Sequence, residues 1–235
     1  MKPIGVTVIT KSYRRVGRKA VSLFKKHTGL EVLIIEGKDS EGFQLKLKLD
    51  RLCGRRPIIF FDADYWTIRH ADFSGFVPKS GFYGVLDSAV FNPWAFPHTD
   101  CQENGLDETR YINTGFFACD LRDKDTRKVF QIARRSWGRV KSVDTTDQFH
   151  INRALLQLKL PISLLPLIFN YYKRATDWGQ IPYIPREIIG LHGAGIEAKN
   201  KFDELTLQAK VFTVQPHDLH DKAILHYFAK QYQLL

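Results

Sequence analysis

The sequence predicts a single-domain α/β protein in which helices flank a mostly parallel sheet. Strand and helix patterns alternate over the first 120 residues, as in parallel strands joined by right-handed crossovers. The run Ile58–Phe61 is apolar at every position, which is typical of a strand buried on both faces. Hydrophobic residues make up 44% of the 235 residues, enough for a sizeable core, and no repeat or linker divides the chain.

The first part of the chain is expected to supply three strands and two helices. Strands are predicted at 5–10, 31–37 and 58–61, where apolar residues run together. A helix is predicted at 15–27, with its apolar residues on one face, and another at 41–53, although part of that segment alternates as a strand would. This order places the first strand near the third, so that their carboxyl ends open onto the same crevice.

The later elements are less regular, because glycines and prolines weaken the periodicity between residues 73 and 109. We expect one strand within 81–91 and an apolar run at 111–121 with a turn at 113–115. A helix is expected at 123–138 and another beginning at 145. Extended pieces follow within 160–172, and a closing helix is expected at 218–235.

Charge and cysteine content limit the function classes. Lys and Arg exceed Asp and Glu by 35 − 25 = 10, and such a balance attracts nucleic acid, acidic lipid headgroups or phosphorylated substrates. No block of five like charges and no nucleic-acid motif occurs, which argues against a nucleic-acid partner. Three scattered cysteines favour a reducing compartment over a disulfide framework or structural zinc. With no bilayer-spanning run and no signal-peptide pattern, we expect a cytoplasmic protein.

Asp62 and Asp64 form the most informative motif. They follow the apolar run Ile58–Phe61 and are separated by Ala63, so that in an extended backbone both carboxylates point to the same side. Ligands of open α/β sheets bind beyond the carboxyl ends of the strands. Two carboxylates at that place suit a divalent cation that holds a phosphate. The alternative for this motif alone is a surface turn.

Five features occur along the chain in one order. They are a strand ending in Thr10, Asp62-Ala63-Asp64, Asn113-Thr114-Gly115, Asp147-Gln148 and His192-Gly193-Ala194-Gly195. Together they resemble the GT-A glycosyltransferases, above all the retaining group that includes the glycogenin and lipopolysaccharide galactosyltransferase family. The nucleotide-diphospho-sugar transferase family is similar too. The resemblance implies a Rossmann-like sheet, with a nucleotide-sugar-binding half at 1–120 and an acceptor-side half with a C-terminal helix at 121–235.

The resemblance also implies a metal site. Its ligands would be Asp62, Asp64 and His192, the histidine lying in an HxxG motif that Gly195 completes. The ion would be Mn²⁺ or Mg²⁺, which stabilises a leaving diphosphate as a Lewis acid, and Mn²⁺ also accepts an imidazole. The alternative for His192 is a structural or surface histidine in a glycine-rich loop.

Asp147 and Gln148 are the catalytic residues that the resemblance implies. The acid would bind donor-sugar hydroxyls, and the glutamine would lie close to the anomeric carbon. Glutamine is not a strong base, so retention would proceed either by same-face attack with the metal-bound phosphate as base or through a covalent enzyme intermediate. The alternative for Asp147 taken alone is an acid in the first turn of a helix, which the helix dipole favours and which needs no function.

The remaining residues implied by the resemblance contact the nucleotide sugar. They are Thr10, Lys11, Tyr13, Lys48, Asp62, Ala63, Asn113, Thr114, Gly115, Asn170, Gly195 and Lys199. Lys46 is an equal candidate to Lys48 in the basic segment before the aspartates. The family often has a lysine six residues after the histidine, where this chain has Ala198. Asp87 is expected to face the acceptor cleft.

The sequence therefore predicts a metal-dependent glycosyltransferase. The donor would be a nucleotide sugar, with UDP-sugar the class that the resembled families mostly use, and the acceptor a glycan or a lipid-linked glycan. The basic surface would help the protein contact the inner membrane face peripherally. One alternative is a phosphohydrolase of the haloacid-dehalogenase type, although Trp66 stands where that family has Thr or Val. The other is a non-enzymatic basic module that binds nucleic acid.

Overall fold

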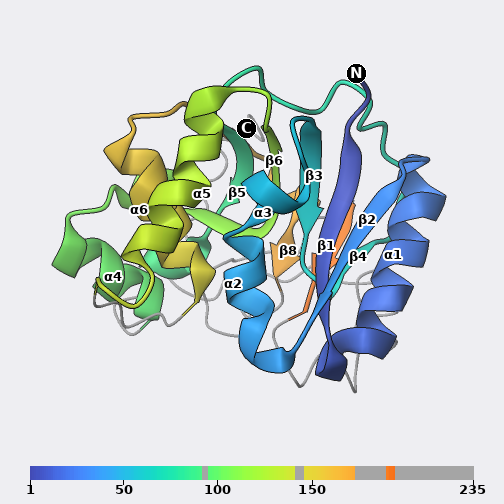
Figure 1. The fold of residues 1–235 in the computed structure, drawn as a ribbon, viewed down its shortest axis with the longest axis horizontal. Coiled ribbons are helices and arrows are strands. Elements are labelled where there is room, and N and C mark those ends of the chain that lie inside the picture. The colour runs from blue at the N-terminus through green and yellow to red at the C-terminus, as the bar shows by residue number, and fades with distance from the viewer. Residues whose placement is uncertain (92–94, 141–145, 173–188, 194–235) are drawn as a thin grey trace, which may run out of the picture.

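The computed structural model describes residues 1–91, 95–140, 146–172 and 189–193. These residues form a six-stranded sheet with helices packed on it, and a separate three-stranded sheet (Figure 1). The predicted site residues Gly195 and Lys199 and the closing helix at 218–235 lie outside the described residues. Within the described part of the chain, no helix combines the length and the hydropathy that are needed to cross a membrane.

The large sheet has the strand order β2-β1-β3-β6-β5-β7. Its strands are β1 (Ile4–Thr10), β2 (Val32–Gly37), β3 (Pro57–Phe61), β5 (Phe82–Leu86), β6 (Ile112–Asp120) and β7 (Ile162–Leu165). Strand β6 is antiparallel to both of its neighbours, and the other five strands run in one direction. The prediction of a mostly parallel sheet with the first strand beside the third is confirmed.

The helices join these strands and cover the sheet. They are α1 (Arg14–Thr28), α2 (Gly42–Lys46), α3 (Leu49–Leu52), α4 (Phe96–Asn104), α5 (Lys124–Ser136) and α6 (Asp147–Gln157). Short 3₁₀ turns are η1 (Lys11–Tyr13), η2 (Asp39–Glu41), η3 (Ser88–Phe91), η4 (Glu108–Arg110) and η5 (Leu167–Phe169). Helix α4 was not predicted from the sequence. Pro97 suggested a break, but it lies at the first turn of α4, where proline is well tolerated.

The single helix predicted at 41–53 is wrong. The chain forms α2 and α3, with an interruption at residues 47 and 48. Leu47 and Leu49 are both buried in one apolar cluster. Residues two positions apart in a continuous helix project about 200° apart, so that one helix face could not bury both. The interruption buries both leucines, which explains the strand-like alternation in this segment.

The turn predicted at residues 113–115 is also wrong. Strand β6 continues through these residues, because Asn113 pairs with Val85 of β5 and the Asp62 N–H, just after β3, donates to the Gly115 carbonyl at 2.9 Å. The irregularity lies on the other side of β6, where Gly84 of β5 pairs with Phe117 but Val85 pairs with Asn113. Strand β6 therefore bulges opposite β5 at the place where it enters the candidate site.

The large sheet is buried on both faces. Ile59 and Phe61 of β3 point toward α1, where the ring of Phe24 stacks on Phe61 with a centroid distance of 4.3 Å. Ile58 and Phe60 point toward α5 and α6. All five residues of β3 are buried, so the interpretation of this run as a strand covered on both faces is confirmed.

A small three-stranded sheet was not predicted, and it positions the distant histidine. It has the order β4-β9-β8, with β4 at Tyr65–Thr67, β9 at Gly190–His192 and β8 at Tyr171–Tyr172. Strands β4 and β9 are antiparallel, and Tyr65 pairs with His192. Because β4 follows directly after the aspartates, this pairing brings His192 to them.

Candidate active site

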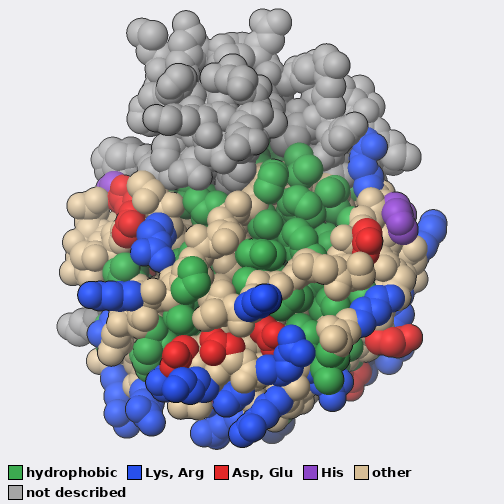
Figure 2. Space-filling model, turned by 90° about the horizontal axis from the view of Figure 1, so that it is seen from above, with side chains coloured by type: hydrophobic (Ala, Val, Ile, Leu, Met, Phe, Trp, Pro, Cys, Tyr) green, Lys and Arg blue, Asp and Glu red, His purple; other side chains and the backbone are tan. Residues whose placement is uncertain are grey.

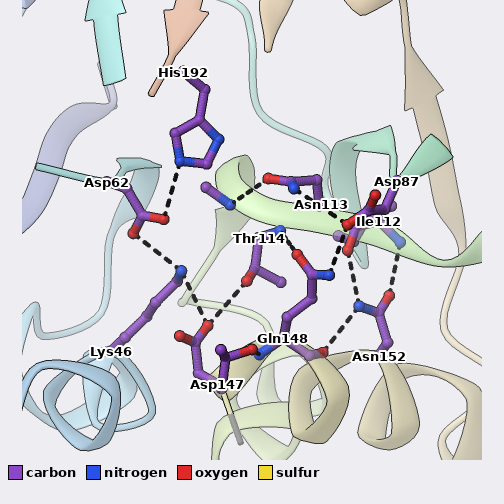
Figure 3. A network of polar contacts seen from close by, with 12 residues as sticks. Lys46, Asp62, Asp87, Ile112, Asn113, Thr114, Asp147, Gln148, Asn152 and His192 are labelled. Carbon is purple, nitrogen blue, oxygen red and sulfur yellow. Dashed lines mark hydrogen bonds and ion pairs between the residues drawn. The ribbon is translucent and has the colours of Figure 1, made fainter. Parts of the chain in front are cut away.

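Asp62, Asp64 and His192 converge at the carboxyl end of β3. Nε2 of His192 lies 3.6 Å from Oδ2 of Asp62 and 3.4 Å from Oδ1 of Asp64. One ligand atom of each residue lies within 4.8 Å of the other two. Figure 3 shows the imidazole pointing at the Asp62 carboxylate from the opposite side to Lys46. The predicted proximity of the three side chains is confirmed, and we call them the carboxylate–histidine group.

Gly115 makes room for the imidazole of His192. A Cβ atom at position 115 would lie 2.6 Å from Nδ1 and 2.8 Å from Nε2 of His192, closer than non-bonded atoms can approach. The resemblance to the glycosyltransferases implied that Gly115 contacts the nucleotide sugar. In the structure the group that approaches it is the His192 ring, so that the glycine and the histidine depend on each other.

The donor atoms of the carboxylate–histidine group suit a divalent cation. Carboxylate oxygens are ligands of Mg²⁺ and Mn²⁺, and Mn²⁺ also accepts imidazole nitrogen. Burial lowers the pKa of His192, but the charge of Asp64, a hydrogen bond to that carboxylate and the charge of Asp62 raise it by more. The imidazole is therefore embedded in excess negative charge, which is an environment that attracts a cation.

Lys46 joins this group to the catalytic pair that the sequence predicted. The side chain is buried, and Nζ lies 3.1 Å from Oδ1 of Asp62 and 3.0 Å from Oδ2 of Asp147. Burial lowers the pKa of Lys46, but the carboxylates of Asp147 and Asp62 raise it by more, so the amine stays charged. The structure thus places Lys46 in the site, whereas Lys48 is the half-buried N-cap residue of α3.

Asp147 and Gln148 lie in the first turn of α6 and are held by Thr114 of β6. Oδ2 of Asp147 accepts from the Thr114 hydroxyl at 2.9 Å, and Oε1 of Gln148 accepts from the Thr114 N–H at 3.0 Å. Nε2 of Gln148 donates to Oδ2 of Asp87 at 2.8 Å. Asp147 is a first-turn acid, as the alternative interpretation held, but it is buried and ion-paired. Its position is fixed by two elements besides its own helix.

A set of amide side chains continues the network from Gln148 toward η5. Asn113 accepts at Oδ1 from the Gly115 N–H and from Nδ2 of Asn170, both at 2.9 Å, and donates to Asp87 at 3.3 Å. Oδ1 of Asn170 is buried and has no hydrogen-bond partner among the described residues. Figure 3 shows Asn113, Asp87 and Gln148 pointing toward one another. We call Asp87, Asn113, Gln148 and Asn170 the amide network.

Asn152 supports the amide network, and the sequence reasoning missed it. Its Oδ1 accepts from the Ile112 N–H at 2.8 Å, and its Nδ2 donates to the Ile112 carbonyl and to the Gln148 carbonyl, both at 2.9 Å. Asn152 follows Gln148 by four positions, so it lies on the same face of α6. That spacing was the signal in the sequence that could have identified it.

The residues predicted to bind the nucleotide follow β1 at the same edge of the sheet. Thr10 is buried at the end of β1, Lys11 is exposed in η1, and Tyr13 is half-buried. Burial, then the charges of Asp64 and Asp62, raise the pKa of the Tyr13 phenol to about 12. Tyr13 therefore lies within the electrostatic reach of the carboxylate–histidine group.

Comparison with known proteins identifies the fold. No protein-family model matches the sequence, and no curated protein matches it. The WbbM bifunctional glycosyltransferase, in its apo structure, superposes with a TM-score of 0.65 and 13% identity over 99% of this chain and 52% of its own. The galactosyltransferase LgtC, solved with donor and acceptor sugar analogues, superposes with a TM-score of 0.62 and 12% identity over 94% of this chain and 99% of its own.

The chain therefore has the GT-A-like fold of glycosyltransferases, as the sequence predicted. It spans about half the length of WbbM and nearly all of LgtC. At these identities the likeness concerns the fold, and a function has to be argued from the residues of the site.

Proposed function

We propose that this protein, built on a fold that glycosyltransferases share, is a metal-dependent glycosyltransferase. It would move a sugar from a nucleotide sugar, with UDP-sugar as the donor class, to a glycan or lipid-linked acceptor. The observation that carries the proposal is the convergence of Asp62, Asp64 and His192 at the carboxyl end of β3. The LgtC structure, which holds donor and acceptor sugar analogues, supports the same two kinds of partner for this chain.

The carboxylate–histidine group would hold the cation. When bound, a divalent cation stabilises the negative charge that develops on the leaving diphosphate. The mixed oxygen and nitrogen donors favour Mn²⁺ over Mg²⁺, which prefers an all-oxygen shell. Lys46 would limit the repulsion between Asp62 and Asp147 before the cation and the donor arrive.

The nucleotide would lie beside Thr10, Lys11 and Tyr13, which follow β1 at this edge of the sheet. The base could stack on the Tyr13 ring, and the Lys11 amine would face the anionic donor. Gly195 and Lys199, which lie outside the described residues, stay proposed contacts of the diphosphate. Lys48 stays a proposed contact as well, although Lys46 is the lysine that reaches the carboxylates.

The donor sugar would lie against the amide network. A buried carbonyl oxygen without a partner is costly. Oδ1 of Asn170 has no hydrogen-bond partner among the residues that the structure describes, so it suits a sugar hydroxyl as donor. Asn113 and Thr114 border the same space from β6. Asp147 would bind a further hydroxyl, with its orientation fixed by Thr114 and Lys46.

Gln148 would lie beside the reacting carbon with its amide in one orientation. A backbone N–H only donates and a carboxylate only accepts, so the amide oxygen faces Thr114 and the amide nitrogen faces Asp87. We propose retention of configuration because the sequence resembles the retaining GT-A families, and Gln148 is not a base. It would proceed either by attack from the face that the diphosphate leaves, with the leaving phosphate as base, or through a covalent enzyme intermediate.

We propose a cytoplasmic protein that contacts the inner membrane face, and a single domain with a donor half and an acceptor half. The phosphohydrolase alternative is weakened by the sequence around Asp62. Trp66 stands where that family has Thr or Val, and the aspartates follow β3, the third strand along the chain, and not the first.

Thermal shift with a panel of nucleotide sugars tests the proposal. Ligand at 100 times its dissociation constant stabilises the folded state by about 2.7 kcal/mol, which raises the melting temperature of a protein of this size by roughly 5–10 °C. We expect one UDP-sugar to give such a shift with Mn²⁺ and a much smaller one with EDTA. If no nucleotide sugar shifts the melting temperature in the presence of Mn²⁺, the proposal is wrong.

A further inference from the structure

The solvent-exposed side of α1 carries cations and no carboxylate. The buried side of this helix packs into the core with Val16, Ala20, Val21 and Phe24. No Asp or Glu occurs from residue 11 to residue 30. Six exposed basic residues form what we call the α1 cationic face: Arg14, Arg15, Arg18, Lys19, Lys25 and Lys26.

Four of these six charges oppose the stability of the helix that carries them, whereas Lys25 and Lys26 lie in the last turn, where the helix dipole favours cations. Arg14 and Arg15 occupy the first turn, which holds no acidic residue, although the positive end of the helix dipole disfavours cations there. Arg14 and Arg18, and likewise Arg15 and Lys19, are like charges four positions apart, which repel each other on a helix. Because the four cations of the first half of α1 do not serve the helix, they point to an anionic partner.

Helix α5 shows the usual arrangement. Lys128 of α5 pairs with Asp125 at 2.7 Å. On the end of the molecule seen from above in Figure 2, Lys and Arg side chains likewise lie among Asp and Glu. Among the described residues, the α1 cationic face makes one ion pair, between Lys25 and Glu31 at 3.5 Å, and both of those side chains are largely solvated. Its positive charge is therefore almost entirely uncompensated within the described structure.

The α1 cationic face begins at the edge of the sheet that holds the candidate site. Helix α1 follows η1 directly, and η1 follows the carboxyl end of β1 (Figure 1). Tyr13, the residue before α1, lies close enough to Asp64 and Asp62 for their charges to raise its pKa. A partner bound along α1 would therefore lie next to the rim of the site.

We propose that the α1 cationic face binds the anionic headgroups of a phospholipid bilayer and holds the site at the membrane surface. A cluster of six cations on one helix face is sufficient for such binding, since each Lys or Arg near an anionic bilayer adds to the attraction. The apolar side of α1 is buried in the core, so the helix cannot insert and the contact is electrostatic. The proposal rests on the proposed function in one respect: the purpose of membrane binding would be to bring the site to a lipid-linked acceptor.

A lipid surface suits these residues better than single-stranded nucleic acid does. Proteins that bind single strands place aromatic side chains among their cations, and the bases stack on them. The exposed positions of α1 hold Arg, Lys and Ser22, and none of them is aromatic. A planar array of phosphate headgroups needs charge alone, which is what this face offers.

Vesicle co-sedimentation of the full chain tests the proposal. We expect the protein to sediment with vesicles of phosphatidylglycerol and phosphatidylcholine at low salt, to be released at high salt, and to stay in solution with phosphatidylcholine alone. Changing Arg14, Arg15, Arg18 and Lys26 together to Gln should weaken binding by roughly 100-fold or more, because each cation contributes about a factor of five. Lys19 is left in place because its amine lies 5.7 Å from the centre of the Trp66 ring.

The matched control removes the same charge from another surface. Changing Lys124, Lys128, Arg135 and Arg139 to Gln removes four exposed cations on and after α5, so both variants have the same net charge. The control should bind vesicles within a few-fold of the unchanged protein. The α1 variant should melt at the same temperature as the unchanged protein or above it, because repelling charges are removed. This result would exclude unfolding as the cause of lost binding.

Three results would overturn the assignment. The first is a failure to bind phosphatidylglycerol vesicles at low salt, and the second is an equal loss of binding in both variants. The third is retention on a short DNA that needs the four α1 cations while vesicles are not bound, which would make nucleic acid the partner. Failure of the proposed function has a separate signature, since sugar nucleotides would then give no thermal shift in a protein that still binds vesicles.

Discussion

The carboxylate–histidine group and the amide network lie side by side and are held in different ways. Asp62, Asp64 and His192 are drawn together by charge, with two acids facing one imidazole. In the amide network every contact is a hydrogen bond whose donor and acceptor are fixed by chemistry, as between Gln148 and Asp87. The first group has excess negative charge and suits a cation. The second sets orientation and suits the recognition of hydroxyl groups.

Lys46 links the two, since its amine bonds Asp62 and also Asp147, which Thr114 joins to Gln148 of the amide network. This division implies that changes in the first group should act on metal binding, whereas changes in the second should act on turnover or on stability. The following predictions test that division, beginning with the largest expected effect.

Changing Asp64 to Ala should abolish metal-dependent transfer and leave the fold intact. Loss of a direct ligand should exceed the roughly 10- to 100-fold loss that follows removal of an outer residue of a metal site. Activity assays and Mn²⁺ titration by calorimetry measure the two effects. Asp72→Ala is the control, because Asp72 is an exposed carboxylate on the loop after β4. Full activity in Asp64→Ala would remove the basis of the metal assignment.

Changing Gly115 to Ala should weaken Mn²⁺ binding by about 10- to 100-fold, because the new methyl group would displace the His192 ring. The measurement is Mn²⁺ affinity in four proteins: unchanged, Gly115→Ala, His192→Ala and the double variant. If Gly115 acts by seating His192, the glycine change should add little once the histidine is gone. Additive effects would mean instead that Gly115 acts through another contact, such as the donor sugar.

Changing Asp87 to Asn should lower kcat by about 10- to 100-fold with little change in Mn²⁺ affinity. An amide at position 87 can donate as well as accept, so Gln148 would no longer be held in one orientation. Steady-state kinetics and the same calorimetric titration separate the two quantities. A parallel loss of Mn²⁺ affinity would contradict the separation of the amide network from the carboxylate–histidine group.

The sequence allowed prediction of the residues of the first group but not of the way they meet. Asp62 and Asp64 follow an apolar run, so their place at the end of a buried strand was readable from local pattern. The pairing of β4 with β9 was not, because each is a three-residue strand and their contact joins residues more than a hundred positions apart. The proximity of His192 to the aspartates was predicted from the resemblance to a family and not from periodicity.

For the amide network, the sequence identified individual residues without their partners. Asn113 was predicted in a turn, but pairing with Val85 of β5 keeps it in a strand, which local propensity does not encode. The sequence could not decide which of Lys46 and Lys48 enters the site. The answer depends on the interruption between α2 and α3, which in turn depends on the packing of Leu47 and Leu49. Tertiary contacts decided each of these cases.

The smallest effect on the chemistry of the site is expected for Asn152, which holds the network in place without facing the site. Changing Asn152 to Ala removes the partners of both backbone groups of Ile112 and leaves them buried, which should cost about 1–3 kcal/mol each before relaxation. Since each kcal/mol corresponds to about 2–4 °C in a protein of this size, we expect the melting temperature to fall by several degrees. Asn104→Ala removes one hydrogen bond, to the Asp100 carbonyl at the end of α4, and should have a much smaller effect. Mn²⁺ affinity should stay unchanged in both, because neither asparagine contacts the carboxylate–histidine group. A loss of Mn²⁺ affinity in Asn152→Ala would show that the two parts of the site are coupled through β6 and not only through Lys46.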